Sequence, residues 1–229
     1  MADNNFYTHG KHFAISDIHG CAYTFLELLN KINFSKDDTL FILGDMISRG
    51  KHSKKVIKSI LSMQKEGYSI IPLRGNHEQF VISGFKQKEN EVFFKTCKRM
   101  NLSWLFNKTD YSYKEKYYSF FEHLPFYYTY KNFLLSHAGF DFSQEDFFAN
   151  KYAMLNQRKT PLASSIPDST HIVHGHTPTS LKKIERSIIY KLPVINIDNG
   201  CVYKNMKDKG SLICINLDDF TLISQKNID

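Results

Sequence analysis

The sequence predicts an α/β fold in which helices cover a β-sheet. Short apolar runs of strand length recur along the 229 residues, and most of them end in Gly, Asp, Asn or His, as buried strands that lead into loops do. Two segments between the first three runs repeat apolar residues every three or four positions, the spacing of amphipathic helices. This order of strands and helices indicates a sheet flanked by helices.

The predicted elements alternate in the first third of the chain and become more irregular later. The segments 21–33 and 53–65 have helical spacing, and Ser53 is expected to cap the second helix. Residues 79–131 are expected to form a largely helical insert within a single domain that spans 1–229. Little helix is expected between the last three strands, so their pairing need not be parallel. The expected strands are 12–17, 39–45, 69–76, 132–139, 171–177, 193–200 and 211–219.

Composition narrows the class of protein. Hydrophobic residues make up 42% of the chain, enough for a packed core, and the aromatic-rich segment 104–130 is interpreted as a small helical core rather than a recognition platform. The net charge of +7 fits a solvated basic surface better than a nucleic-acid footprint, and it also suits phosphorylated substrates. The four cysteines form no C-x-x-C pair, which argues against a thiolate zinc site.

The expected compartment is the cytoplasm. The first residues, MADNNFYTHGKH, contain no apolar signal core, and no apolar run is long enough to span a bilayer. Export through a machinery that reads other signals stays open. We expect a monomer with neither a membrane nor a nucleic acid as partner.

Polar residues gather where the predicted strands end, the edge at which open α/β sheets bind ligands. Five clusters occur there: S-D-I-H-G, G-D-M-I-S-R-G, G-N-H-E, S-H-A-G and H-G-H-T. Each cluster alone is weak, but together they supply carboxylates, imidazoles and an amide. This mixed oxygen and nitrogen set suits Mn, Fe or Zn better than Ca.

The five clusters together resemble the motifs of the metallophosphoesterase superfamily, and within it the phosphoprotein-phosphatase branch of bacterial and phage type. That branch is marked by G-D-x-H-G, G-D-x-x-D-R-G and G-N-H-E, followed by two later histidines. The motifs run from about residue 14 to 177. The later segments NIDNGCVY and LICINLDD resemble the last strands of the bacterial and phage-type members. The resemblance implies a calcineurin-like metallophosphoesterase fold, with two mixed β-sheets sandwiched between helices.

The resemblance also implies two divalent metal ions, with Mn²⁺ expected and Fe or Zn as alternatives. Asp45 would bridge the two ions, and Asn76 would give the second ion a neutral oxygen, which leaves excess positive charge for the phosphate. A hydroxide that bridges the metals would attack phosphorus directly. The implied ligands are Asp17, His19 and Asp45 for the first ion, and Asp45, Asn76, His137 and His176 for the second.

Three further residues receive catalytic roles from the resemblance. His77, which follows the sharp turn that Gly75 is expected to permit, would be the general acid. Arg49 and Arg158 would grip the phosphate oxygens, although Arg158 fits a plain surface position equally well. Tyr203 fits either a phosphate contact or a core position.

One departure from the motif bears on the substrate. Ser48 stands where the second aspartate of G-D-x-x-D-R-G belongs, and serine cannot supply the charge that stabilises protonated His77. We expect a lower pKa at His77 and weaker acid catalysis, which an alkoxide leaving group tolerates less than a nucleotide does. The symmetrical diadenosine tetraphosphate hydrolases also lack this aspartate. Those enzymes are usually longer and have the motif G-N-H-D. The corresponding motif here ends in Glu78, as in the compact protein phosphatases.

These observations leave several functions open. The first interpretation is a metal-dependent serine/threonine-type protein phosphatase that acts on phosphorylated proteins. The alternative is a hydrolase of diadenosine tetraphosphate and related dinucleoside polyphosphates. Another phosphoester, such as a nucleic-acid end or a small metabolite, is a further option. The last is a non-catalytic, metal-stabilised binding domain.

Overall fold

The computed structural model describes residues 10–86, 91–107, 112–159, 161 and 165–229, and within them it has two mixed β-sheets. The first sheet has the strand order β3-β2-β1-β8-β9. Its parallel part pairs β1 with β2 and β2 with β3, while β8 runs antiparallel to both β1 and β9. The strands are β1 (His12–Ile15), β2 (Thr39–Ile42), β3 (Ser69–Pro72), β8 (Ser211–Asn216) and β9 (Leu222–Lys226).

The second sheet has the order β4-β5-β6-β7. Strand β4 is antiparallel to β5, whereas β5, β6 and β7 are parallel to one another. The strands are β4 (Tyr127–Tyr130), β5 (Phe133–Ser136), β6 (His171–His174) and β7 (Val194–Asn196). Parallel strands require crossover connections, and helix α7 (Leu181–Ile189) provides the one between β6 and β7.

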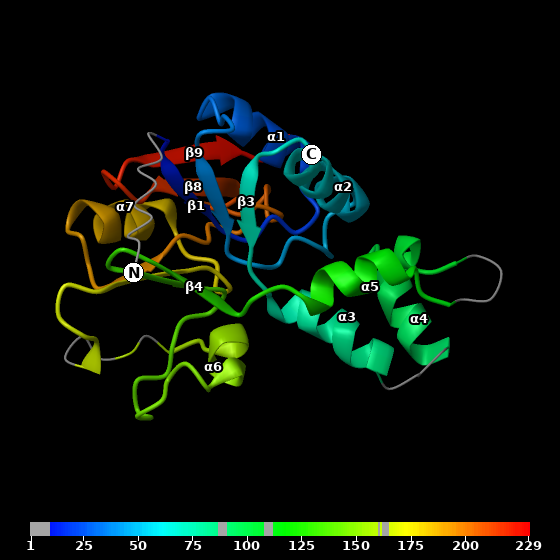
Figure 1. Cartoon of the computed structure of the whole chain (residues 1–229). Coiled ribbons are helices and arrows are strands. Elements are labelled where there is room, and N and C mark those ends of the chain that lie inside the picture. Colours follow the sequence, from blue (N-terminus) through cyan, green and yellow to red (C-terminus); the bar gives the residue numbers. More distant parts are fainter. Residues whose placement is uncertain (1–9, 87–90, 108–111, 160, 162–164) are drawn as a thin grey trace, which may run out of the picture.

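Buried side chains form layers on and between the sheets. Ala14 and Phe41 of the first sheet belong to the same apolar cluster as Leu135 and Val173 of the second. A second cluster joins the opposite face of the first sheet to helices α1 (Ala22–Lys31) and α2 (Ser53–Lys65). Helix α6 (Lys151–Asn156) packs on the outer face of the second sheet (Figure 1). The two sheets therefore lie between layers of helix.

Helices dominate the described part of residues 79–131. Helix α3 (Asn76–Lys86), α4 (Glu91–Arg99), η1 (Ser103–Leu105) and α5 (Glu115–Glu122) follow one another, and α3, α4 and α5 lie together at one side of the molecule (Figure 1). Their aromatic residues pack inward, because Phe106, Tyr117 and Phe121 are buried in the cluster that also contains α1 and α2. This packing favours the small-core interpretation. Residues 87–90 and 108–111 of this segment lie outside the described residues.

Several predicted elements differ from the structure. Strands β4 and β9 were not predicted, and α7 fills the gap in which little helix was expected. Ser53 is not the N-cap of α2, since His52 occupies that position and Ser53 Oγ accepts a hydrogen bond from Ser48 N at 2.9 Å. In the described part of the chain, no helix is long and apolar enough to cross a membrane. The expectation that the first twelve residues hold no signal core falls mostly on residues 1–9, which lie outside the described part.

Candidate metal centre

The loops that follow β1, β2, β3, β5 and β6 meet at one edge of the two sheets. His19 N donates a hydrogen bond to Asp45 O at 2.8 Å, which joins the first two loops. His176 N donates to Asp17 Oδ1 at 3.1 Å, which joins the β6 loop of the second sheet to the β1 loop of the first. Polar residues from the loops of both sheets therefore lie close together at this edge.

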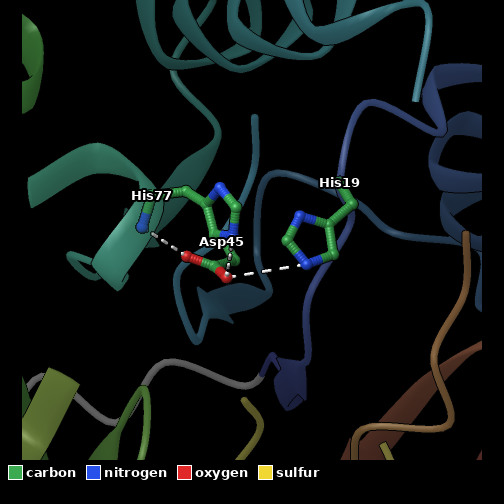
Figure 2. A group of neighbouring side chains, drawn as sticks. All are labelled: His19, Asp45 and His77. Carbon is green, nitrogen blue, oxygen red and sulfur yellow. Dashed lines mark hydrogen bonds and ion pairs between the residues drawn. The ribbon is translucent and has the colours of Figure 1, made fainter. Parts of the chain in front are cut away.

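Asp45 lies at the centre of this group of polar residues. Its Oδ2 atom is 3.6 Å from Nε2 of His19, 3.6 Å from Nε2 of His137 and 3.7 Å from Nε2 of His77. Figure 2 shows the carboxylate of Asp45 between the rings of His19 and His77. Two groups with metal-ligand spacing share Asp45: His19, Asp45 and His77 form one, and Asp45, His137 and His176 form the other.

The protonation of two histidines is fixed by backbone carbonyl groups. His19 Nδ1 lies 3.1 Å from Ile47 O, and His137 Nδ1 lies 2.9 Å from Leu43 O. A neutral imidazole carries one N–H, so Nδ1 donates in both residues and Nε2 presents a lone pair to the centre. Burial lowers the pKa of both rings well below the usual value, which favours this neutral form.

The nitrogen and oxygen atoms at this site point lone pairs at one another, an arrangement that a bound cation would stabilise. His137 Nε2 lies 3.0 Å from Asn76 Oδ1 and 3.1 Å from His176 Nδ1. Because Nδ1 of His137 already donates, its Nε2 lone pair faces the lone pairs of the Asn76 carbonyl oxygen. This contact is favourable when a positive ion lies among the donors, and the mixed N and O set suits a transition metal.

Burial makes the charged forms of three carboxylates in and beside this site unfavourable when no cation is bound. Burial raises the pKa of Asp17 well above its usual value, and the nearby charges of Asp198 and Asp45 raise it further. Burial and the charge of Glu78 raise the pKa of Asp45 in the same way. Burial also raises the pKa of Asp198 to about 6. Divalent ions would remove these costs by stabilising the ionised forms.

A family model described as calcineurin-like phosphoesterase matches residues 11–205, which is most of the chain. The chain belongs to the calcineurin-like phosphoesterase family. The predicted fold, two mixed sheets between helices, is confirmed. Proteins of this family are metallophosphoesterases with dinuclear metal centres, and the two candidate metal-binding groups that share Asp45 fit this family.

Curated relatives match a limited part of the chain. A symmetrical bis(5'-nucleosyl)-tetraphosphatase from Buchnera aphidicola is 43% identical over 86 residues, which cover 36% of this chain and 30% of the relative. The enzyme of the same name from Acidovorax ebreus is 39% identical over 72 residues, which cover 31% of this chain and 25% of the relative. The chain thus spans less than a third of the length of these curated relatives.

Solved structures match almost the whole fold. A candidate diadenosine tetraphosphatase superimposes with a TM-score of 0.66 at 20% identity, covering 94% of this chain and 92% of that one. A serine/threonine phosphatase from Saccharomyces cerevisiae superimposes with a TM-score of 0.64 at 17% identity, covering 99% of this chain and 82% of that one. At these identities the likeness concerns the fold alone.

The structure brings together all the ligands that the metallophosphoesterase resemblance implies. They are contributed by five loops and are joined by the contacts given above: Asp17, His19, Asp45, Asn76, His137 and His176. His77 lies as close to Asp45 as His19 does, so proximity alone does not distinguish an acid from a ligand at this position.

The two predicted arginines lie differently. Arg49 is exposed, its Nη1 donates to the hydroxyl of Tyr203, and its positive charge lowers the pKa of His77. Arg158 is exposed, and its charge acts on His176. Both arginines are therefore exposed and act electrostatically on histidines of the candidate site, and only Arg49 is held by a contact with Tyr203.

Ser48 occupies the position from which an aspartate would contact the proposed acid. Its Oγ atom lies 2.6 Å from His77 Nδ1. The pKa of His77 is lowered to about 4, first by burial and then by the positive charges of Arg49 and His176. Ser48 supplies a hydrogen bond without the negative charge that would oppose these effects, as the sequence predicts.

Sequence reasoning missed two buried carboxylates. Asp198 Oδ1 accepts from Gly200 N at 2.6 Å, and its Oδ2 is buried with no hydrogen-bond partner among the described residues. Glu78 accepts backbone hydrogen bonds from Asp45, Met46, Ile47 and Gly75. The signal for Asp198 was its place after the apolar run PVINI, the same pattern that the proposed ligands follow.

Gly75 differs from its expected role. Its φ is not positive, so the turn does not need glycine for its backbone angles. A Cβ atom at this position would lie 2.2 Å from Asp45 Oδ1 and 2.3 Å from Asp45 N. Gly75 is therefore required because the loop after β3 approaches the Asp45 loop closely.

Proposed function

We propose that the protein hydrolyses dinucleoside polyphosphates such as diadenosine tetraphosphate. The observation that carries this proposal is the contact of Ser48 Oγ with His77 Nδ1 at 2.6 Å. A phosphate group of a nucleotide leaves without a proton more readily than a serine alkoxide does, so a weakened acid suits the nucleotide substrate. The names of the relatives support the same choice. The sequence alone placed the protein phosphatase first, and this proposal reverses that order.

The residues of the centre have proposed roles in this reaction. Asp45 would bridge two divalent ions, Mn²⁺ first and Fe or Zn as alternatives, which when bound would supply positive charge and an activated water. Arg49, aligned by Tyr203, would hold the non-bridging phosphate oxygens, and Arg158 would contact the substrate from the rim. His77 would donate a proton to the leaving group through Nε2 while Ser48 holds Nδ1. The remaining proposed ligands are Asp17, His19, Asn76, His137 and His176.

A side-by-side assay tests the proposed substrate. With added Mn²⁺, kcat/KM for diadenosine tetraphosphate is expected to exceed that for a phosphoserine peptide by at least about 100-fold, or about 2.7 kcal/mol in transition-state stabilisation. Both reactions should stop on chelation. A higher kcat/KM for the peptide would restore the protein-phosphatase interpretation. Failure to hydrolyse even an aryl phosphate would favour the non-catalytic binding domain.

Replacing Ser48 with aspartate is expected to shift the preference toward alkoxide leaving groups. The added charge beside Nδ1 stabilises protonated His77 and raises its pKa, so the acid form persists to higher pH. Hydrolysis of a phosphoserine peptide should accelerate roughly tenfold, and its alkaline limit should move to higher pH. Rates on an aryl phosphate, which needs little protonation, should change less than about twofold.

Ser48→Asn is the matched control, because asparagine has the shape of aspartate without its charge. Ser48 has φ of 71°, a backbone conformation that both Asp and Asn tolerate better than most residues. Equal pH profiles for the two variants would contradict an electrostatic role of this position.

A further inference from the structure

A cavity of about 460 Å³ adjoins the metal centre without containing any of its proposed ligands. Two of its lining residues directly follow proposed ligands in the chain: Ala138 follows His137, and Thr177 follows His176. The rest of the wall comes from β6, β7, the segment after α6 and the first turns of α7. The cavity is therefore adjacent in the chain to two proposed ligands of the second ion, and the charge of its lining residue Arg158 acts on His176. Its volume falls within the range of small-molecule sites.

The charge of the cavity is positive. Arg158, Lys159 and Lys183 line it, and among the described residues no Asp or Glu does. Helix α7 begins at Leu181 beside the cavity, with no acidic residue in its first turn and no side-chain cap at Ser180. The positive end of the helix dipole therefore adds to the three cations. An anionic ligand is favoured, and a basic peptide is disfavoured.

The floor and wall of the cavity suit a ligand that is partly apolar. Val194 of β7 contributes aliphatic surface, and the fully buried Ile172 of β6 lies beneath the floor. His174 Nδ1 lies 3.0 Å from Gly175 O and donates to it, which leaves Nε2 as a hydrogen-bond acceptor. Thr177 Oγ1 is buried without a hydrogen-bond partner among the described residues, so it can still donate and accept.

We propose that this cavity is the subsite for the nucleotide portion of a polyphosphate substrate whose scissile phosphate lies at the metal centre. A nucleotide combines a flat, largely apolar base that carries hydrogen-bonding edges with a chain of anionic phosphates. The aliphatic floor, the polar groups of His174 and Thr177, and the cationic rim match these parts in turn. The inference rests on the proposed function and specifies which part of the molecule recognises the nucleotide.

Charge reversal at Lys183 tests the subsite. Lys183→Glu is expected to raise KM for diadenosine tetraphosphate about tenfold, equivalent to 1.4 kcal/mol, because a phosphate contact becomes a repulsion. Turnover at saturation should stay within about twofold, and aryl phosphate kinetics should not change, because Lys183 belongs to no proposed catalytic group. The matched control is Lys182→Glu, an exposed neighbour on α7 that does not line the cavity.

Inhibition by ADP separates this inference from the proposed function. ADP is tested as an inhibitor of aryl phosphate hydrolysis, with inorganic pyrophosphate alongside, in wild type and in both lysine variants. The subsite is supported if ADP inhibits more strongly than pyrophosphate. It is supported further if Lys183→Glu raises the inhibition constant of ADP about tenfold and Lys182→Glu leaves it unchanged. This result would support the subsite even if diadenosine tetraphosphate proved to be no substrate.

Two outcomes would overturn the subsite. One is equal inhibition by ADP and pyrophosphate, because the nucleoside would then make no contribution. The other is an equal loss of ADP inhibition in Lys183→Glu and Lys182→Glu, because the loss would then come from general surface charge. If wild type nevertheless cleaved diadenosine tetraphosphate, the proposed function would stand without this subsite. Circular dichroism and thermal unfolding of both variants should match wild type, since both lysines are exposed.

Discussion

Asp45→Asn is expected to reduce hydrolysis of every phosphoester by at least about 1,000-fold, because it removes the charge that the two proposed ions would share. Asp45 Oδ2 lies 3.6 Å from Nε2 of both His19 and His137, so its loss affects both groups of ligands. The metal content measured by elemental analysis should fall from about two ions per chain toward one or none. Activity on an aryl phosphate with saturating Mn²⁺ completes the measurement.

Thermal unfolding provides an independent readout for the same variant. In chelator, Asp45→Asn should be at least as stable as wild type, because it relieves repulsion with the buried carboxylates Glu78 and Asp198. With Mn²⁺, wild type should gain about 2.7 kcal/mol at 100 times its Kd, and the variant should gain less. The exposed Asp168→Asn is the control and should behave as wild type. Retention of two ions and most activity in Asp45→Asn would contradict the proposed bridge.

The sequence was sufficient to predict the parts of the fold that depend on local pattern. Strands β1, β2 and β3 begin where they were predicted to begin, because each is an apolar run bounded by turn residues. The six candidate ligands come together because parallel strands end at a common edge, so residues far apart in sequence meet there.

Other features depend on contacts that no local pattern encodes. Strand β4, with the sequence YYTY, lies in a segment whose aromatic residues also suit a helix, and its pairing with β5 decides its conformation. Helix α2 has the bounds predicted for it, 53–65, but the capping role of Ser53 was wrong, because Ser53 Oγ accepts a hydrogen bond from Ser48 N of the preceding loop. Asp198 acquires its importance from burial beside Asp17, which becomes visible only after the strands are assembled.

Glu78→Ala is expected to destabilise the protein by at least about 4 kcal/mol, because it leaves four buried backbone N–H groups without an acceptor. Glu78 is fully buried, and its carboxylate accepts from Asp45 N, Gly75 N and Met46 N at 3.0 Å and from Ile47 N at 3.3 Å. A loss of this size lowers the melting temperature by roughly 8 °C or more in a chain of this length. Thermal unfolding with and without Mn²⁺ measures it.

The same substitution should weaken metal binding, because Glu78 joins the Asp45 loop to the first turn of α3, which begins at Asn76. Glu78→Gln gives a graded comparison: its carbonyl oxygen still accepts two of the four bonds, while its NH₂ group faces the remaining donors. We therefore expect its stability and Mn²⁺ affinity to lie between those of wild type and Glu78→Ala.

Glu115→Ala is the matched control, because Glu115 is an exposed glutamate in the first turn of α5 and has a similar relation to its helix dipole. If Glu78→Ala melted within about 2 °C of Glu115→Ala, the four backbone bonds would contribute little, and the position of Asp45 would have to depend on other contacts. If Glu78→Ala lost stability but kept full Mn²⁺ affinity, Glu78 would support the fold without orienting the bridging ligand.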